Sequence, residues 1–153
     1  MHIQNDILTE EIIALPRRRA LLPLWIKIFI WIFMISSLVV PIAILLGIFG
    51  GTMDISIYGF ETNDPFSSLG IFLLGLFLFK GIVSYMMYTE KEQAINLAFV
   101  DALLGVSLCT YHMINNYLTI GGVSIRLEIV VFIPYIIKLL RIREPWRIAT
   151  PKQ

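Results

Sequence analysis

The chain has 153 residues, of which 58% are hydrophobic and 15% are charged, and its formal net charge is +1. Soluble domains carry about 25% charged residues, and the core of a chain this short cannot hide so much apolar surface. A soluble globular protein is therefore excluded. The apolar residues instead gather in blocks of about 20 residues, the length that crosses a bilayer as a helix.

The first 23 residues precede every apolar block and predict a cytoplasmic juxtamembrane segment. Acidic residues lie ahead of the basic triplet, and the block that follows is far longer than the core of a cleaved signal peptide, about 7–15 residues. We therefore interpret this block as a retained first span. Basic residues at the membrane surface bind anionic lipid headgroups. The residues predicted to do so are Arg17, Arg18, Arg19, Arg141 and Arg143.

Four apolar blocks predict four transmembrane helices packed as a bundle, and hence an all-α integral membrane protein. The blocks cover residues 24–50, 67–88, 94–114 and 125–141. The fourth block is short, and it reaches span length when Arg126 and Lys138 extend their charged ends outward. Residues 24–141 then form one transmembrane domain, and residues 142–153 form a basic cytoplasmic tail.

Lysine and arginine are unevenly distributed among the segments that flank these blocks, which predicts the orientation of the chain. Basic residues precede the first block, occupy the turn after the second block at Lys91, and follow the fourth. The loop over residues 51–66 carries Asp54, Glu61 and Asp64 but no lysine or arginine. Both termini are therefore predicted to face the cytoplasm.

One charged residue lies inside each of the second and third blocks. The turn "TEKEQ" joins these blocks into an antiparallel hairpin. Lys80 is ten residues before Glu90 and Asp101 is ten residues after Lys91, so the two charges fall at matching depth. An unpaired charge at mid-bilayer costs about 2.5–3.5 kcal/mol, which pairing avoids. The predicted ion pair is either a structural lock for the hairpin or a proton or ion relay, and both interpretations stay open.

A second polar cluster is predicted at the outer ends of the third and fourth blocks, and it contains His112, Asn115, Asn116, Arg126 and Glu128. Folding the chain about residues 119–121 brings His112 opposite Glu128. The same fold brings Asn115 opposite Arg126. His112 also follows Asp101 by eleven residues, which places both on nearly the same helix face.

Small residues and prolines indicate how the helices pack. Small residues recur at steps of three or four in the third block, at Ala94, Ala98, Ala102, Gly105 and Cys109, and in the first, at Ala43, Gly47 and Gly51. Such stripes let another backbone approach closely, either inside the bundle or from a second copy or partner subunit. Pro41 and Pro134 each free a carbonyl four residues earlier and predict kinks in the first and fourth spans.

The sequence contains none of the short motifs that mark nucleotide-binding loops, serine hydrolases or zinc proteases. No catalytic residue, metal site or cofactor is predicted. The one cysteine cannot form an internal disulfide, and two histidines offer too few ligands for a His/Cys metal centre. The basic tail is too short and too close to the membrane to predict nucleic-acid binding.

The run "GLFLFKGIVSYMMYTEKEQAINLAFVDALLG", followed by "RLEIVVFIPYIIKLLRI", resembles a group of small bacterial four-helix membrane proteins to which no activity is assigned. The shared elements are "FKGI", the acidic–basic turn, "AIxLxxxDAxxG" and "RLExxxxIPYxxKL". They include Lys80, Asp101, Arg126 and Glu128. The resemblance implies the bacterial inner membrane as the location and transfers no catalytic role.

Three functions are compatible with these features. The leading one is a non-enzymatic membrane protein that acts through helix packing with itself or with a partner membrane protein. The second is a small transporter or channel subunit that uses Lys80, Asp101, His112 and Glu128. The third is an accessory subunit of a membrane enzyme. A cavity that reaches Asp101 would favour the second, whereas a scaffold would bury the ion pair dry.

Overall fold

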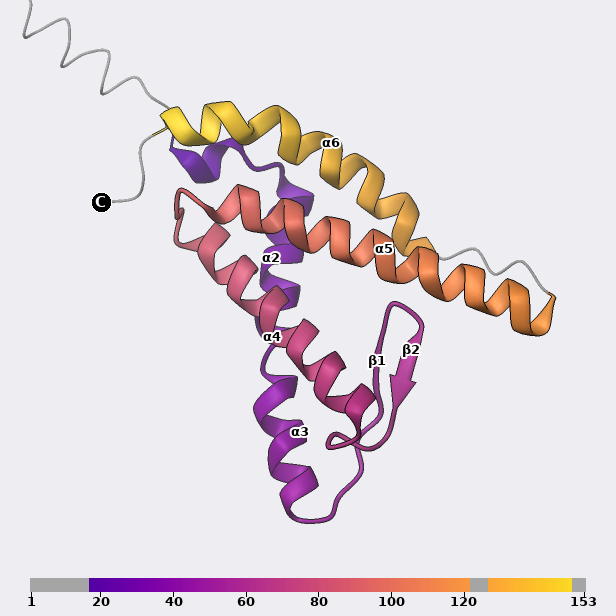
Figure 1. Ribbon diagram of the computed structural model, residues 1–153. Helices are drawn as coiled ribbons and strands as arrows, with labels where there is room; N and C mark the ends of the chain where they lie inside the picture. Colours follow the sequence, from indigo (N-terminus) through magenta and orange to yellow (C-terminus); the bar gives the residue numbers. More distant parts are fainter. Residues whose placement is uncertain (1–16, 122–126, 150–153) are drawn as a thin grey trace, which may run out of the picture.

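A computed structural model of the chain describes residues 17–121 and 127–149, and these are mostly helical (Figure 1). In chain order the elements are the 3₁₀ helix η1 (Arg18–Leu21), α2 (Leu24–Ser36), α3 (Val39–Ile48), β1 (Ile55–Ile57), β2 (Phe60–Thr62), α4 (Ser68–Tyr88), α5 (Ala94–Ile120) and α6 (Leu127–Ile148).

Three described segments are long and apolar enough to cross a membrane, namely Leu24–Ile48, Ser68–Tyr88 and Ala94–Thr119. The membrane class predicted from composition is therefore borne out for these three segments. The fourth predicted span falls in α6, which has 22 residues and the length to span. It does not qualify by composition, because its second half carries Lys138, Arg141, Arg143, Glu144 and Arg147.

The first span consists of two helices, because regular α-helical hydrogen bonding breaks at Ser37 and Leu38. Pro41 has no N–H to donate to the Ser37 carbonyl, four residues earlier. That carbonyl accepts instead from Val40 N at 3.2 Å in a tighter turn. The Ser37 hydroxyl donates to Met34 O at 2.7 Å. The kink predicted from Pro41 thus lies at the residue whose carbonyl the proline leaves free.

The helices pack in the order α2, α4, α5, α6, each against the next. In Figure 1, α4 with α2 and α3 forms one arm and α5 with α6 forms another; the arms converge near η1 and diverge toward β1–β2, which lies between them. Ile26, Met87 and Trp146 belong to the apolar core at the convergent end. Ile55 and Leu73 belong to a second core beneath the hairpin.

The loop after α3 folds into a β-hairpin, so the all-α prediction needs this correction. β1 and β2 pair antiparallel, with Ile57 opposite Phe60. Tyr58 and Gly59 form the tip, with φ angles of 55° and 92°. Positive φ at both positions gives a two-residue turn whose twist matches the strands. Tyrosine is rare in this region, and the ring of Tyr58 is buried, with 6% of the residue exposed.

The turn between α4 and α5 is closed by two backbone hydrogen bonds. Lys91 N donates to Met86 O at 3.0 Å, and Glu90 N donates to Met87 O at 3.3 Å. Glu90 has a φ of 58°. This is the pattern of a Schellman motif, in which the residue after the helix takes the left-handed conformation. The short antiparallel hairpin predicted from "TEKEQ" is therefore present.

Arg18 lies inside the protein, with 8% of the residue exposed. Its Nε donates to Trp146 O at 2.9 Å, and its Nη1 donates to Glu90 O at 2.8 Å. The Trp146 indole in turn donates to Lys91 O at 3.0 Å. Arg18 therefore ties η1 to α6 and to the α4–α5 turn, and it faces protein rather than the lipid headgroups that the sequence predicted. The exposed members of the predicted headgroup set are Arg17, Arg141 and Arg143.

Two helices run past the predicted ends of their spans. α5 continues beyond residue 114 to Ile120 and stops at Gly121, which has a φ of 73°. α6 continues beyond residue 141 to Ile148, and the helix contains both Pro134 and Pro145. Both predicted ends came too early because amide or charged side chains end the apolar block in the sequence, whereas the helix continues through them. With 27 residues α5 is about 40 Å long, which exceeds the roughly 30 Å hydrocarbon layer.

The predicted small-residue stripe of α5 is occupied by the chain itself. The alanines of this stripe and Cys109 are fully buried. Gly105 lies beneath the rings of Phe132 and Tyr58. In the first-span stripe, Gly47 lies against the ring of Phe66 and, among the described residues, Gly51 contacts only Leu46 of its own turn, and both glycines are half-buried. The α5 stripe therefore serves packing within the chain.

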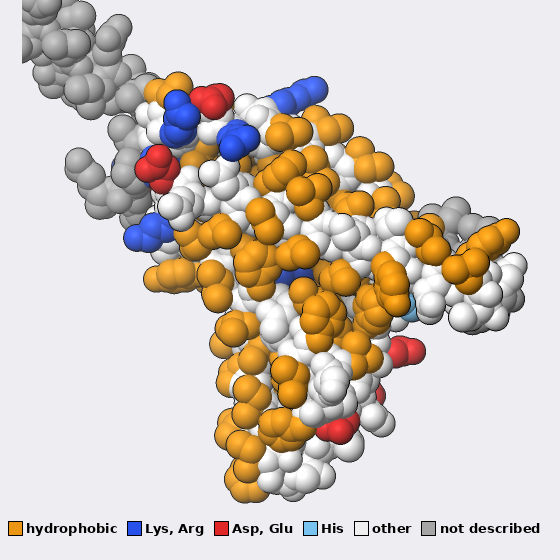
Figure 2. Space-filling view, viewed as in Figure 1, with side chains coloured by type: hydrophobic (Ala, Val, Ile, Leu, Met, Phe, Trp, Pro, Cys, Tyr) orange, Lys and Arg blue, Asp and Glu red, His pale blue; other side chains and the backbone are white. Residues whose placement is uncertain are grey.

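Apolar side chains cover the middle of the molecule in Figure 2, while lysine and arginine gather at the η1 end, where acidic side chains also lie, and further acidic side chains lie on the hairpin side. Large apolar residues are exposed along every α-helix, Leu118 at 75% and Leu127 at 77% among them. Soluble monomers rarely expose contiguous apolar areas of this kind. This surface fits the membrane class.

Candidate functional site

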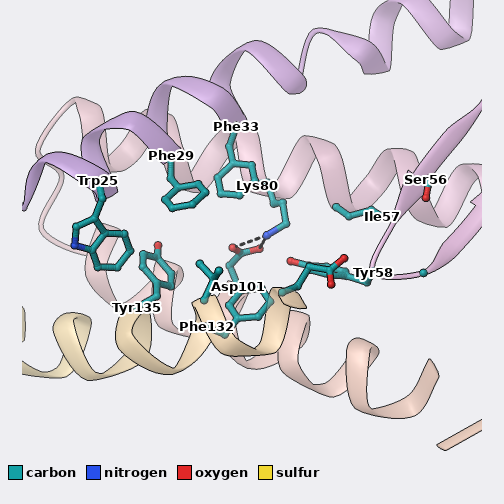
Figure 3. A pocket seen from close by; sticks show the side chains of 13 residues that line it. Trp25, Phe29, Phe33, Ser56, Ile57, Tyr58, Lys80, Asp101, Phe132 and Tyr135 are labelled. Atoms are coloured by element: carbon teal, nitrogen blue, oxygen red, sulfur yellow. Dashed lines mark hydrogen bonds and ion pairs between the residues drawn. The ribbon is translucent and has the colours of Figure 1, made fainter. Parts of the chain in front are cut away.

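A cavity of about 370 Å³ lies between α2 and α6, where one residue of α4 and one of α5 also line it (Figure 3). Small-molecule sites in proteins typically measure about 300–1,000 Å³. Ionisable side chains from three helices line it: Lys80 of α4, Asp101 of α5 and Glu128 of α6. Its aromatic lining consists of Trp25, Phe29, Phe33, Tyr58, Phe132 and Tyr135.

The α2 wall is aromatic because three rings recur at steps of four residues, which places them on one helix face. The Trp25 and Phe29 rings meet edge to face at 6.1 Å between centroids. The Phe29 and Phe33 rings stack at 6.0 Å. The wall is thus a continuous row of rings, which Figure 3 shows above the ion pair.

Lys80 and Asp101 form the floor of the cavity. Lys80 Nζ donates to Asp101 Oδ2 at 2.9 Å and to Oδ1 at 3.1 Å. The side chains are only 3% and 9% exposed. The contact is the one that the hairpin register predicts. Gly81 allows α4 to lie close to α2, which places Lys80 at this contact. A Cβ atom at position 81 would lie 2.7 Å from Ser37 Oγ and would push α4 away from α2.

Three aromatic rings surround the Lys80 ammonium. The distances from Nζ to the ring centroids are 4.7 Å for Phe33, 5.1 Å for Tyr58 and 5.9 Å for Phe132. A cation near a ring face gains about 0.5–2 kcal/mol, more where water is excluded. Asp101 and the rings together replace the hydration that Lys80 loses on burial.

Tyr58 reaches this site from the hairpin tip and lies over Gly105, where a Cβ atom would come within 2.7 Å of Tyr58 Oη. Within the described part of the chain, this buried hydroxyl has no hydrogen-bond partner. Burial, and next the nearby Asp101 carboxylate, raise the pKa of the Tyr58 phenol above its ordinary value. Tyr58 therefore stays protonated and presents a neutral hydroxyl beside the ion pair.

Aromatic side chains lie at the two ends of the cavity, which is also partly open to the surface of the molecule. Toward η1, the Trp25 and Tyr135 rings meet at 6.1 Å between centroids and join α2 to α6. At the other end stands the hairpin tip, with Ile57 and Tyr58 (Figure 3). The Tyr58 and Phe132 rings are 5.9 Å apart, so the tip also touches α6.

The predicted outer cluster is divided between two environments. Glu128 lines the cavity, together with Lys80 and Asp101. The His112 ring packs edge to face against Phe60 of β2, at 5.4 Å between centroids. Asn115 is exposed and Asn116 is half-buried, while Arg126 lies outside the described residues. The placement of Asn115 opposite Arg126 stays a prediction.

Neither the hairpin nor the aromatic residues were predicted as part of the site. Signals for both exist. "ISIYGFET" alternates apolar and polar residues around a Tyr-Gly turn, a pattern typical of a β-hairpin. The aromatic series Trp25, Phe29 and Phe33 shares one helix face by its spacing. Nothing in either pattern, however, indicates that α6 would supply the facing wall.

Chemically, the cavity offers hydrogen bonding, charge and aromatic surface. In the described ranges, no group of three or more His, Cys, Asp or Glu side chains lies close enough to hold a metal ion. The ion pair uses both carboxylate oxygens of Asp101. The Tyr58 hydroxyl and Glu128 remain as polar groups for a ligand, within walls that are otherwise largely apolar. No protein family, curated protein or solved structure matches this chain.

Proposed function

We propose that this chain is a four-span membrane protein, with both termini in the cytoplasm, that binds a small molecule between α2 and α6 as a transporter or channel subunit. The observation that carries the proposal is that Lys80 and Asp101 line a cavity of about 370 Å³. A pair that served only as a lock would lie in a packed interface, without ligand-sized space beside it.

The first part of α6 supports the fourth span. It lies alongside α5, and its outward residues are apolar and exposed: Leu127, Val130, Ile133, Ile137 and Leu140. These side chains need lipid rather than water. The basic residues near η1 and in the second half of α6 support cytoplasmic termini, because cytoplasmic segments are enriched in lysine and arginine. A bacterial inner membrane agrees with the resemblance noted above.

The cavity is accessible to a ligand. Trp25 and Tyr135 lie at its end near η1, and the tip residue Tyr58 lies at the other. Between these ends the cavity is partly open to the surface of the molecule, which gives a small molecule a way in.

The alternative of a scaffold that acts only through helix packing loses part of its support, because the small-residue stripe of α5 is filled within the chain. It also leaves the cavity and the unpartnered Tyr58 hydroxyl without a role. No observation among the described residues favours an accessory subunit of an enzyme.

Cysteine accessibility tests the cavity. In a Cys109→Ser background, Val131→Cys places a thiol on the cavity wall, and Val130→Cys places one on the exposed apolar surface beside it. Thiols react with water-soluble iodoacetamide as thiolates, so reaction requires water. We expect the thiol at position 131 to react at least about tenfold faster than the control. Equal, slow reaction at both positions would contradict a water-filled cavity.

The same reagents in a membrane-impermeant form test the topology. We expect Glu61→Cys, in β2, to react from outside the cell and Lys91→Cys, in the α4–α5 turn, only after the membrane is opened. Reaction of the hairpin cysteine from the cytoplasmic side alone would overturn the proposed orientation.

A further inference from the structure

We propose that the ligand is a small organic cation with an apolar body. This inference rests on the proposed ligand-binding function and names the chemical class of the ligand. It follows from the charge of the cavity wall, from the state of Lys80 and from the aromatic lining.

The described wall of the cavity has a net negative charge. Its formally charged side chains are Lys80, Asp101 and Glu128, one positive and two negative, so its formal net charge is −1. Lys80 and Asp101 neutralise each other at 2.9 Å. Glu128 is left as the carboxylate that can respond to a ligand. Glu128 is exposed, so water partly screens its interaction with a ligand, but the sign of its charge still favours cations over anions.

Lys80 is unsuited to bind an anion. Its ammonium has three donors, and two contacts go to the oxygens of Asp101. The remaining directions face aromatic rings, the nearest being Phe33 at 4.7 Å. An anionic ligand would have to displace a carboxylate held at hydrogen-bond distance. Among the described residues, no other lysine or arginine lines the cavity.

The aromatic lining is suited to a cation. Three rings already surround the ammonium of Lys80, which shows that these walls accept a positive charge. Trp25, Phe29 and Tyr135 line the part of the cavity beyond the ion pair. Tryptophan is the strongest cation–π partner among the side chains. The unpartnered Tyr58 oxygen adds a hydrogen-bond acceptor for a ligand that carries an N–H group.

The test compares three probes of similar size by calorimetry, with the full chain in phosphatidylcholine nanodiscs and empty discs subtracted. The cation is phenyltrimethylammonium, the neutral molecule of nearly the same shape is tert-butylbenzene, and the anion is benzenesulfonate. We expect the cation to bind at least about tenfold more tightly than either of the others.

Two substitutions and a control locate the binding. We expect Glu128→Gln to weaken cation binding about tenfold, the effect of removing one partly screened charge. Trp25→Leu should weaken it about threefold or more, through the lost cation–π contact. Glu144→Gln is the matched control, because Glu144 is an exposed carboxylate of α6 that pairs with Arg147 and does not line the cavity. It should leave the affinity unchanged.

The outcomes separate this inference from the proposed function. If tert-butylbenzene or benzenesulfonate binds as tightly as the cation, and Trp25→Leu weakens that binding, the cavity takes a ligand but the cation inference is wrong. Equal effects of Glu128→Gln and Glu144→Gln would also refute the inference. If none of the three probes binds, the inference fails, and labelling of the Val131→Cys variant independently decides whether the cavity exists.

Discussion

Breaking the Lys80–Asp101 pair from one side should destabilise the protein far more than replacing both residues. The single changes are Asp101→Leu and Lys80→Met, and the double change combines them. Each single change leaves a charge in a site where the side chains are 3% and 9% exposed. The double change leaves apolar side chains of similar volume in the same space.

The magnitude follows from the geometry. At 2.9 Å and an effective dielectric constant of 20, the attraction between the charges is about 6 kcal/mol. Removing the two ions from water costs several kcal/mol each, so the intact pair is close to neutral compared with an apolar replacement. A remaining unpaired charge has no such offset, and we expect each single change to cost about 3–5 kcal/mol. The double change should stay within about 1 kcal/mol of the original protein.

The two single changes should also differ from each other. Asp101→Leu leaves the ammonium among the rings of Phe33, Tyr58 and Phe132, and these still stabilise a cation. Lys80→Met removes the ammonium that donates both hydrogen bonds to the Asp101 carboxylate. The remaining negative charge then lies beside the faces of the same rings, which are themselves negative. Lys80→Met should therefore be the more damaging change.

The assay is reversible unfolding in mixed micelles, with the free energy of unfolding of all four proteins measured under one condition. Additive effects of the single changes in the double variant would refute the reasoning. If the double variant is stable, its affinity for phenyltrimethylammonium then separates the two roles: unchanged binding assigns the pair to the fold, and lost binding assigns it to the site.

Two further substitutions probe positions that the structure singles out, each with a control of the same residue type. Gly105→Ala should cost about 1–3 kcal/mol of stability, because its Cβ atom would press on two rigid rings; Gly75→Ala, where a Cβ atom meets open space, should stabilise α4 by about 0.5–1 kcal/mol. Arg18→Gln should cost about 3 kcal/mol, since two hydrogen bonds from a buried charge are lost, whereas Arg17→Gln, at an exposed position, should change stability by less than about 0.5 kcal/mol. Unfolding midpoints measured in the same micelles check all four, and equal effects within either matched comparison would contradict its explanation.

Local features of the sequence were sufficient to predict the membrane class and the ion pair. An apolar block of span length indicates that the helix is surrounded by lipid, and this holds whichever helices pack against it. The contact of Lys80 with Asp101 was predictable because a short turn sets the register of two antiparallel helices, and register is a matter of counting residues. The break near Pro41 was equally local, because the proline removes one specific hydrogen bond.

The existence and the lining of the cavity follow only from the tertiary structure. It depends on how α2 and α6 rotate and diverge, and these helices come from opposite ends of the chain with no short turn between them. The same rotation turns Glu128 toward the cavity and buries Arg18 against backbone carbonyls that no sequence pattern identifies. Tyr58 reaches the ion pair only because a hairpin folds back between the two arms. Spacing along one helix determines which residues share a face, but what that face meets depends on the packing of the whole chain.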